Sequence, residues 1–123
     1  MDMNVYYDNK NQVTNFDGNT LTINNEKYSD NLMLTNESVN IIDIISIEDI
    51  NEVFILNIIK LKPDIVIFGT GNNIKYIKQD ILYLLQKNNI GVEVMAIAPL
   101  CRTYNFLLSE DRKVIAIVIF DKD

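Results

Sequence analysis

The chain has 123 residues and a formal charge of −6 at pH 7, from 11 Lys and Arg against 17 Asp and Glu. It contains no His and one Cys, which excludes Ser-His-Asp and Cys-His nucleophiles, imidazole acid–base chemistry and an internal disulfide. It also excludes Cys-rich and His-containing metal sites. The acidic balance argues against nucleic-acid binding, which needs many phosphate-neutralising side chains. We therefore expect no metal, no cofactor and no nucleic-acid partner.

The length indicates a single domain over residues 1–123. The start, Met1–Asn4, has neither the basic nor the apolar region of a secretory signal. The Ile-rich stretch 41–59 is interrupted by four acidic residues, which a membrane-spanning helix does not tolerate. These features predict a cytoplasmic protein without a transmembrane segment.

The first half of the chain has the pattern of β structure. Short β-prone runs alternate with turn-forming Asn, Asp, Gly and Ser. We expect strands over Val13–Phe16, Thr20–Ile23, Leu32–Thr35 and Val39–Asp43.

A helix is predicted after these strands. Ser46 with Asp49 three residues later resembles a capping box. The residues expected on its apolar face are Ile50, Val53, Phe54 and Ile58. Pro63 ends this segment because it biases Lys62 away from helical angles.

The second half alternates strands and helices. A buried strand over 64–68 and a turn over 69–73 precede an amphipathic helix over 73–88. The apolar face of this helix is Ile74, Ile77, Ile81, Leu84 and Leu85. A strand over 92–95 completes a parallel βαβ unit. A helix from Pro99 to about Ser109 and a strand over 113–120 follow, so the fold class is α/β with a β-rich N-terminal portion.

The first candidate site is the glycine turn Gly69-Thr70-Gly71. Ligands of open parallel sheets bind beyond the carboxyl ends of the strands, and a helix start offers free N–H groups to an anion. The third glycine of a dinucleotide fingerprint and the Gly-Lys-Ser/Thr of a P-loop are both missing. The turn is either part of an anion site or only a tight connection.

The second candidate is Glu93, which alternates with Val92 and Val94 in its strand. It either faces solvent or is held by polar groups, with Arg102 and Arg112 as the candidate partners.

The third candidate is the run Cys101-Arg102-Thr103-Tyr104-Asn105. A Cys near a helix start and beside an Arg can have a lowered pKa, but a buried and inert thiol is the alternative. The polar residues Thr103, Tyr104 and Asn105 either hold neighbouring loops or face a cleft. If strands 64–68 and 92–95 are parallel neighbours, the glycine turn, Arg102 and Thr103 converge on one sheet edge and suit a small anion.

The C-terminal half resembles domain-of-unknown-function family 498. The resemblance rests on Phe68–Gly71, Gly91–Met95, Cys101–Leu108 and Glu110–Val114, and departs from the family at Ile97, where we expect Thr. The family includes the adipogenesis-associated domain protein and a mitochondrial assembly factor of respiratory complex I. The resemblance implies a three-layer α/β fold with a mixed central sheet, additional N-terminal β structure and no established enzymatic activity.

The family motifs fall here on the glycine turn and on several polar residues. These positions are Gly69, Thr70, Gly71, Glu93, Arg102, Thr103, Tyr104, Asn105 and Arg112. The resemblance implies a non-catalytic binding or assembly protein with protein partners, linked in mitochondrial relatives to respiratory complex assembly. The alternative is a small-molecule or anion-binding enzyme or sensor that uses Glu93 with Arg102 or Arg112. Apolar edge strands of the N-terminal half make a homodimer a further expectation.

Overall fold

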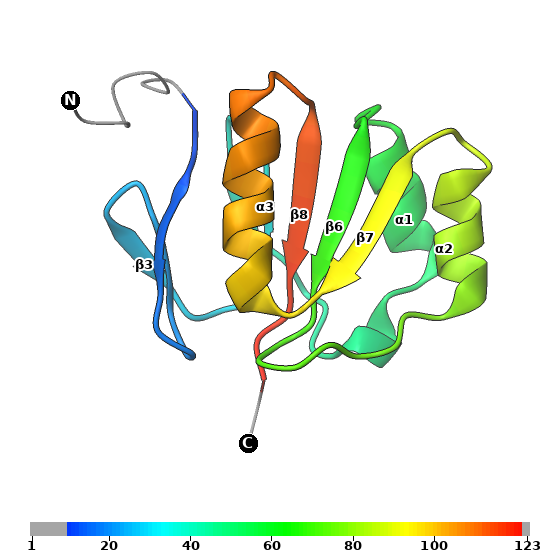
Figure 1. Cartoon of the computed structure of the whole chain (residues 1–123). Helices are drawn as coiled ribbons and strands as arrows, with labels where there is room; N and C mark the ends of the chain where they lie inside the picture. The colour runs from blue at the N-terminus through cyan, green and yellow to red at the C-terminus, as the bar shows by residue number, and fades with distance from the viewer. Residues whose placement is uncertain (1–9, 122–123) are drawn as a thin grey trace.

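The computed structural model describes residues 10–121, and the chain start Met1–Asn4 discussed above lies outside them. A five-stranded mixed sheet, in the order β5-β4-β8-β6-β7, forms the centre of the molecule. Figure 1 shows β8, β6 and β7 side by side in this sheet. Its strands are β4 (Leu32–Leu34), β5 (Val39–Ile41), β6 (Ile65–Gly69), β7 (Gly91–Met95) and β8 (Val114–Val118).

Strand β8 lies in the middle of this sheet. It pairs in parallel with β6 on one side and antiparallel with β4 on the other. All five of its residues are buried, as expected for a strand whose two faces are both covered. The edge strands are β5 and β7.

The N-terminal portion forms a separate three-stranded antiparallel sheet. It consists of β1 (Val13–Phe16), β2 (Leu21–Ile23) and β3 (Glu26–Tyr28). Its apolar residues Val13, Leu21 and Ile23 share one core with Leu32 and Leu34 of β4 and with helix α3. The small sheet therefore adds to one side of the central sheet, as the family resemblance implies.

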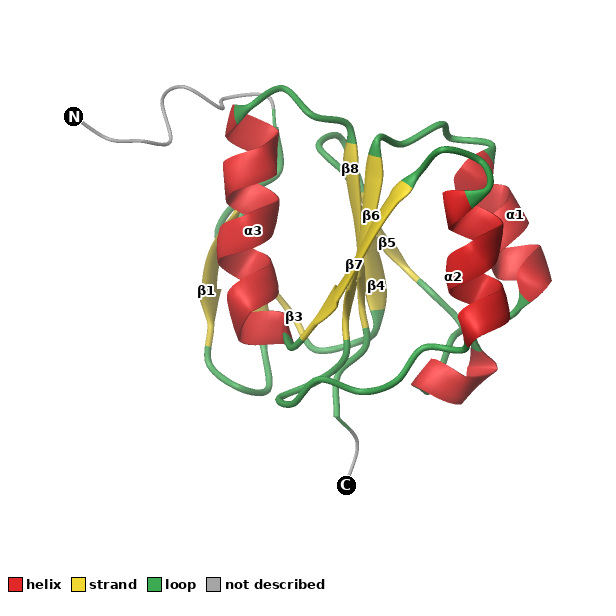
Figure 2. Ribbon diagram, turned by 45° about the vertical axis from the view of Figure 1, so that its right-hand side comes forward, coloured by secondary structure: helices red, strands yellow, loops and turns green. Residues whose placement is uncertain are grey.

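Helices cover both faces of the central sheet. Figure 2 shows α3 (Ile97–Ser109) and the small sheet on one side, and α1 (Glu52–Ile59) and α2 (Gln79–Gln86) together on the other. The three-layer α/β architecture and the βαβ unit β6–α2–β7 are confirmed. Over the described residues, no helix has the length and apolar content to cross a membrane.

The boundaries of two helices differ from the sequence prediction. Ser46 and Asp49 do form a capping box, but it begins only a single 3-10 turn, η2 (Ile47–Asp49). Helix α1 starts later, capped by the Asn51 side chain, which accepts from the Phe54 N–H at 2.9 Å. Val53, expected on the apolar face of the helix, is 69% exposed.

Helix α2 is shorter than predicted because residues 72–78 form a loop, and the helix begins at Gln79. Ile77, Ile81 and Leu85 are buried as expected, whereas Ile74 lies in the loop and is 66% exposed. The strand β3 was not among the predicted elements, since its residues Glu26, Lys27 and Tyr28 have no apolar alternation.

Asn31, just before β4, is one of two buried polar residues in the described part of the chain. Its Nδ2 donates to the carbonyls of Ile44 at 2.8 Å and Ile45 at 3.1 Å, and its Oδ1 accepts from the Phe120 N–H at 2.8 Å. One amide thus joins three segments: the start of β4, the loop before η2 and the end of β8.

Replacing Asn31 with Ala should lower the free energy of unfolding by about 3 kcal/mol, because it leaves buried backbone groups without partners. Asn40→Ala in the neighbouring strand β5, where the residue is exposed, should cost less than about 0.5 kcal/mol. Urea denaturation of both variants measures the difference, and equal losses would show that the Asn31 bonds contribute nothing special.

Candidate functional site

The glycine turn lies at the carboxyl end of β6, as predicted. Thr70 is fully buried. Its hydroxyl donates to the Asn73 carbonyl at 3.0 Å and accepts from the Lys75 N–H at 2.9 Å. Its own N–H donates to the Met95 carbonyl at 2.9 Å. Thr70 therefore fixes the loop 72–78 against the end of β7, and its hydroxyl is engaged inside the fold.

Gly71 is required by both its backbone and its surroundings. Its φ of +93° lies in the region that favours glycine. A methyl group at this position would overlap the carboxylate of Asp121. Asp121 accepts from the Asn72 N–H at 2.9 Å and forms an ion pair with Lys75.

Asp121 was not among the sequence-based candidates. Hydrogen bonds from the Lys75 side chain and the Asn72 N–H hold the pKa of its carboxyl below the usual value. The interaction joins positions 46 residues apart, so no local pattern indicates it.

The start of helix α3 offers little to an anion. The Ile97 N–H donates to the Gly71 carbonyl at 2.9 Å, and Pro99 has no N–H to donate. Two of the first three amides of α3 are therefore unavailable. Helix α2 begins at Gln79, well beyond the glycine turn. The turn and the two helix starts thus do not combine into a set of free donors.

Tyr104 and Asn105 hold the small sheet against α3. The Tyr104 hydroxyl donates to the Asn11 carbonyl at 3.0 Å. Asn105 accepts from the Val13 N–H at 3.0 Å and donates to the Val13 carbonyl at 2.7 Å. Tyr104 is fully buried, and burial raises the pKa of its hydroxyl. Of the two alternatives for this cluster, these contacts favour the holding of neighbouring segments.

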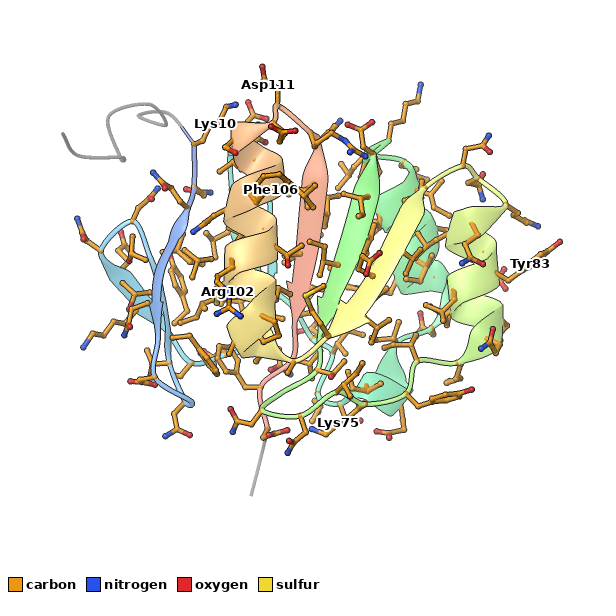
Figure 3. The ribbon with its side chains drawn as sticks, in the orientation of Figure 1. Lys10, Lys75, Tyr83, Arg102, Phe106 and Asp111 are labelled. Atoms are coloured by element: carbon orange, nitrogen blue, oxygen red, sulfur yellow. The ribbon has the colours of Figure 1, made fainter. Side chains whose placement is uncertain are left out.

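Glu93 lies in the middle of the edge strand β7, opposite Ile67, and is exposed. Arg102 is exposed on the outer side of α3 (Figure 3). Arg112 follows α3 and lies 3.9 Å from the Asp64 carboxylate. Among the described residues, no ion pair joins Glu93 to either arginine. Thr103 is half-buried on α3.

Cys101 is half-buried on α3, and its thiol donates to the Ile97 carbonyl at 3.2 Å. Burial raises the pKa of this thiol to about 11 and outweighs the opposing effect of Arg102. The sulfur therefore stays protonated and poorly nucleophilic at neutral pH. The structure favours the inert thiol over the reactive one.

The hollow with the most apolar surroundings at this end of the sheet lies beside the loop 72–78, and we call it the carboxyl-edge hollow. Its volume is about 340 Å³ and it is lined by Ile74, Lys75, Tyr76, Ile77, Gln79, Leu82 and Val94. Ile74 and Tyr76 are 66% and 83% exposed. None of the sequence-based candidates lines it. The apolar residues Ile74 and Tyr76 follow the glycine turn closely and could have indicated this hollow. The expected helix instead placed Ile74 on its apolar, core-facing side.

The family model described as "Protein of unknown function (DUF498/DUF598)" matches residues 13–119. The chain therefore belongs to this family, as its C-terminal motifs predict. A protein from Bordetella parapertussis has the same fold, with a TM-score of 0.83 over 91% of this chain and 97% of its own, at 24% identity.

Two curated relatives match part of the chain. The Xenopus tropicalis "NADH dehydrogenase [ubiquinone] 1 alpha subcomplex assembly factor 3" is 32% identical over 60% of this chain and 42% of its own length. The "13 kDa major membrane protein" of Francisella tularensis subsp. holarctica is 34% identical over 50% of each chain. The chain thus spans about half the length of the curated relatives it matches. The cytoplasmic location expected from the sequence stays a prediction.

Gly71→Ala should lower the free energy of unfolding by about 2 kcal/mol or more, from the positive φ and the displaced Asp121 carboxylate. Gly18→Ala is the matched control, because Gly18 has a φ of +102° and open space around it. It should cost only the backbone strain, about 1 kcal/mol. Equal losses in urea denaturation would show that Asp121 simply moves aside.

Cys101 should react slowly with iodoacetamide in the folded protein. A thiol with a pKa near 11 has about a hundredfold less thiolate at pH 7.5 than an ordinary cysteine. The labelling rate should therefore be at least about a hundredfold lower than in the urea-unfolded chain and should rise steadily from pH 7 to 9. A rate near that of the unfolded chain would contradict the raised pKa.

Proposed function

We propose that this protein is a non-catalytic binding module that assists the assembly of a larger protein complex. The observation that carries this proposal is the carboxyl-edge hollow, where Ile74 and Tyr76 stand exposed beside an apolar depression. Exposed apolar side chains that gather around a depression are typical of protein–protein contact sites.

The engagement of the polar motif residues supports the same proposal. Thr70, Tyr104 and Asn105 use their side chains to join segments of the fold. The alternative function, an anion-binding enzyme or sensor built on Glu93 with Arg102 or Arg112, has no contact among the described residues in its favour.

A neighbouring hollow extends the proposed contact surface. It has a volume of about 220 Å³ and shares Lys75 with the carboxyl-edge hollow. Its wall includes Ile45, which is 70% exposed. The ion pair of Lys75 with Asp121 lies between the two hollows, so a partner would meet apolar side chains on both sides of a fixed polar bridge.

The relative named as an assembly factor of NADH dehydrogenase suggests the first class of partner to test. We propose that the partner is a protein subunit or factor of a respiratory complex. Its contact side should present apolar side chains that fill the hollow, with polar groups around them to satisfy Lys75 and Gln79.

The test is capture of partners from an extract of the native host with the full-length tagged chain. The double variant Ile74→Ser, Tyr76→Ser should capture its partner at least about tenfold less efficiently than the wild type, because it removes the two exposed apolar anchors. Both residues are exposed, so the fold should be unaffected. Quantitative mass spectrometry of the captured proteins gives the ratio.

Tyr83→Ser is the matched control. Tyr83 is 64% exposed on α2 and does not line the hollow, so its replacement should leave capture unchanged. If no protein is enriched by the wild type over the double variant, the proposal fails.

A further inference from the structure

Helix α1 is more apolar than a surface helix needs to be. Six of its eight residues are apolar, whereas a helix on the surface of a domain needs only one apolar stripe toward the core. Ile55 and Ile58 fill that role and are buried, but Val53 and Leu56 are 69% and 41% exposed. The outer side of α1 therefore carries apolar side chains that the described part of the chain does not cover.

An open apolar groove runs beside this helix. A hollow of about 290 Å³ lies between α1 and the β4–β5 hairpin, lined by Met33, Ile42, Phe54, Asn57, Ile58 and Leu61. Met33 and Leu61 also line a second hollow of about 370 Å³ next to it. We call the exposed side of α1, together with the groove beside it, the α1 surface. It shares no residue with the carboxyl-edge hollow.

The charges along the α1 surface are polarised. Asp49 and Glu52 lie at the start of the helix, and Lys60 and Lys62 follow its end. All four side chains are exposed. Among the described residues, none of them takes part in an ion pair. The surface thus has an acidic end and a basic end on either side of an apolar centre.

We propose that the α1 surface binds a second copy of this chain, with the two α1 helices antiparallel about a two-fold axis near Leu56. In that arrangement the acidic start of each helix lies against the basic end of the other. Glu52 of one copy then faces Lys60 of the second copy, four positions on either side of the axis. Val53 and Leu56 of the two copies then pack against each other across the axis.

The distribution of charge along the α1 surface favours a second copy as the partner and favours the antiparallel orientation. A surface that pairs with itself about a two-fold axis must be self-complementary, and an acidic end opposite a basic end meets that requirement. A parallel arrangement would place Glu52 against Glu52 and Lys60 against Lys60, which is repulsive. The antiparallel arrangement also opposes the two helix dipoles, which is favourable.

Dimerisation through the α1 surface goes beyond the proposed function, because it uses a different surface from the carboxyl-edge hollow. Helix α1 is only about 12 Å long, so residues beside the helix must contribute to an interface of the usual size of about 800 Å² per partner. The carboxyl-edge hollow stays open in such a dimer, and each copy keeps its own site for a partner.

Charge exchange tests the proposal by sedimentation equilibrium of the full chain at low salt. The wild type should be a dimer. Glu52→Lys and Lys60→Glu should each weaken dimerisation by about tenfold or more, because each variant converts both cross-axis pairs into like charges. The double variant E52K/K60E should regain wild-type affinity. Circular dichroism should show the same fold for all three variants, because both side chains are exposed.

The sharpest measurement mixes the two single variants. In the mixed pair, the introduced Lys at 52 faces the introduced Glu at 60, and the native Lys60 faces the native Glu52. An equimolar mixture should therefore form dimers although each variant alone forms few. An interaction between positions 52 and 60 within one chain would not restore dimers in this mixture.

Phe106→Ser is the matched control, since Phe106 is 62% exposed on α3, on the other side of the central sheet (Figure 3). It should leave dimerisation unchanged. A wild-type chain that stays monomeric at about millimolar concentration overturns the proposal. A dimer that is insensitive to both charge changes also overturns it. Neither result affects partner capture through Ile74 and Tyr76, so the two proposals fail separately.

Discussion

The pairing of strand β8 with both β4 and β6 is the contact on which the rest of the structure depends. Strand β8, the last strand of the chain, joins the β4–β5 hairpin to the parallel βαβ unit, because β4 pairs with one edge of β8 and β6 pairs with the other. A hydrophobic core lies on each face of β8: Val114, Ala116 and Val118 belong to the core beneath α3, and Ile115 and Ile117 belong to a second core on the side of α1 and α2. A strand in this position needs apolar side chains in both directions, which explains the continuous run at 114–118. Asn31 strengthens the same junction by binding the backbone just beyond β8.

Three of the polar residues that the family motifs single out, Thr70, Tyr104 and Asn105, join segments of the chain around this junction. Asn105 and Tyr104 bind the backbone of residues 11–13 and attach the small sheet to α3, which in turn packs on β6 and β8. Thr70 and the carbonyl of Gly71 connect the end of β6 to the end of β7 and to the start of α3. Buried polar groups are stable only when their hydrogen bonds are made, and here they are made within the chain. These side chains therefore hold the two sheets and helix α3 together.

The sequence allowed the architecture to be predicted well and the contacts of the candidate residues only in part. The strands 64–68 and 92–95 and the helix ending at Ser109 stand out by periodicity and by turn residues, which are local signals. The start of α2 was placed too early because Ile74 continues the helical spacing of Ile77 and Ile81, although the Thr70 hydroxyl binds the Lys75 N–H and holds this segment as a loop. The pairing of Asp121 with Lys75 joins distant positions, and nothing in the local sequence reports it. The long-range hydrogen bonds of Asn31 are also invisible in the local sequence, because an Asn at the start of a strand normally indicates a turn.

The two apolar segments whose helix boundaries were predicted wrongly are also informative about function. Val53 and Ile74 both continue the apolar spacing of a core, yet both are exposed. Ile74 lies in the wall of the carboxyl-edge hollow, and Val53 precedes Phe54, which lines the groove beside α1. A prediction from hydrophobic periodicity places such residues in the core of their own chain, because the pattern does not distinguish burial within the chain from burial against a second molecule. An apolar pattern that the fold leaves uncovered marks surface that another chain can bury, and it does so here at two separate places.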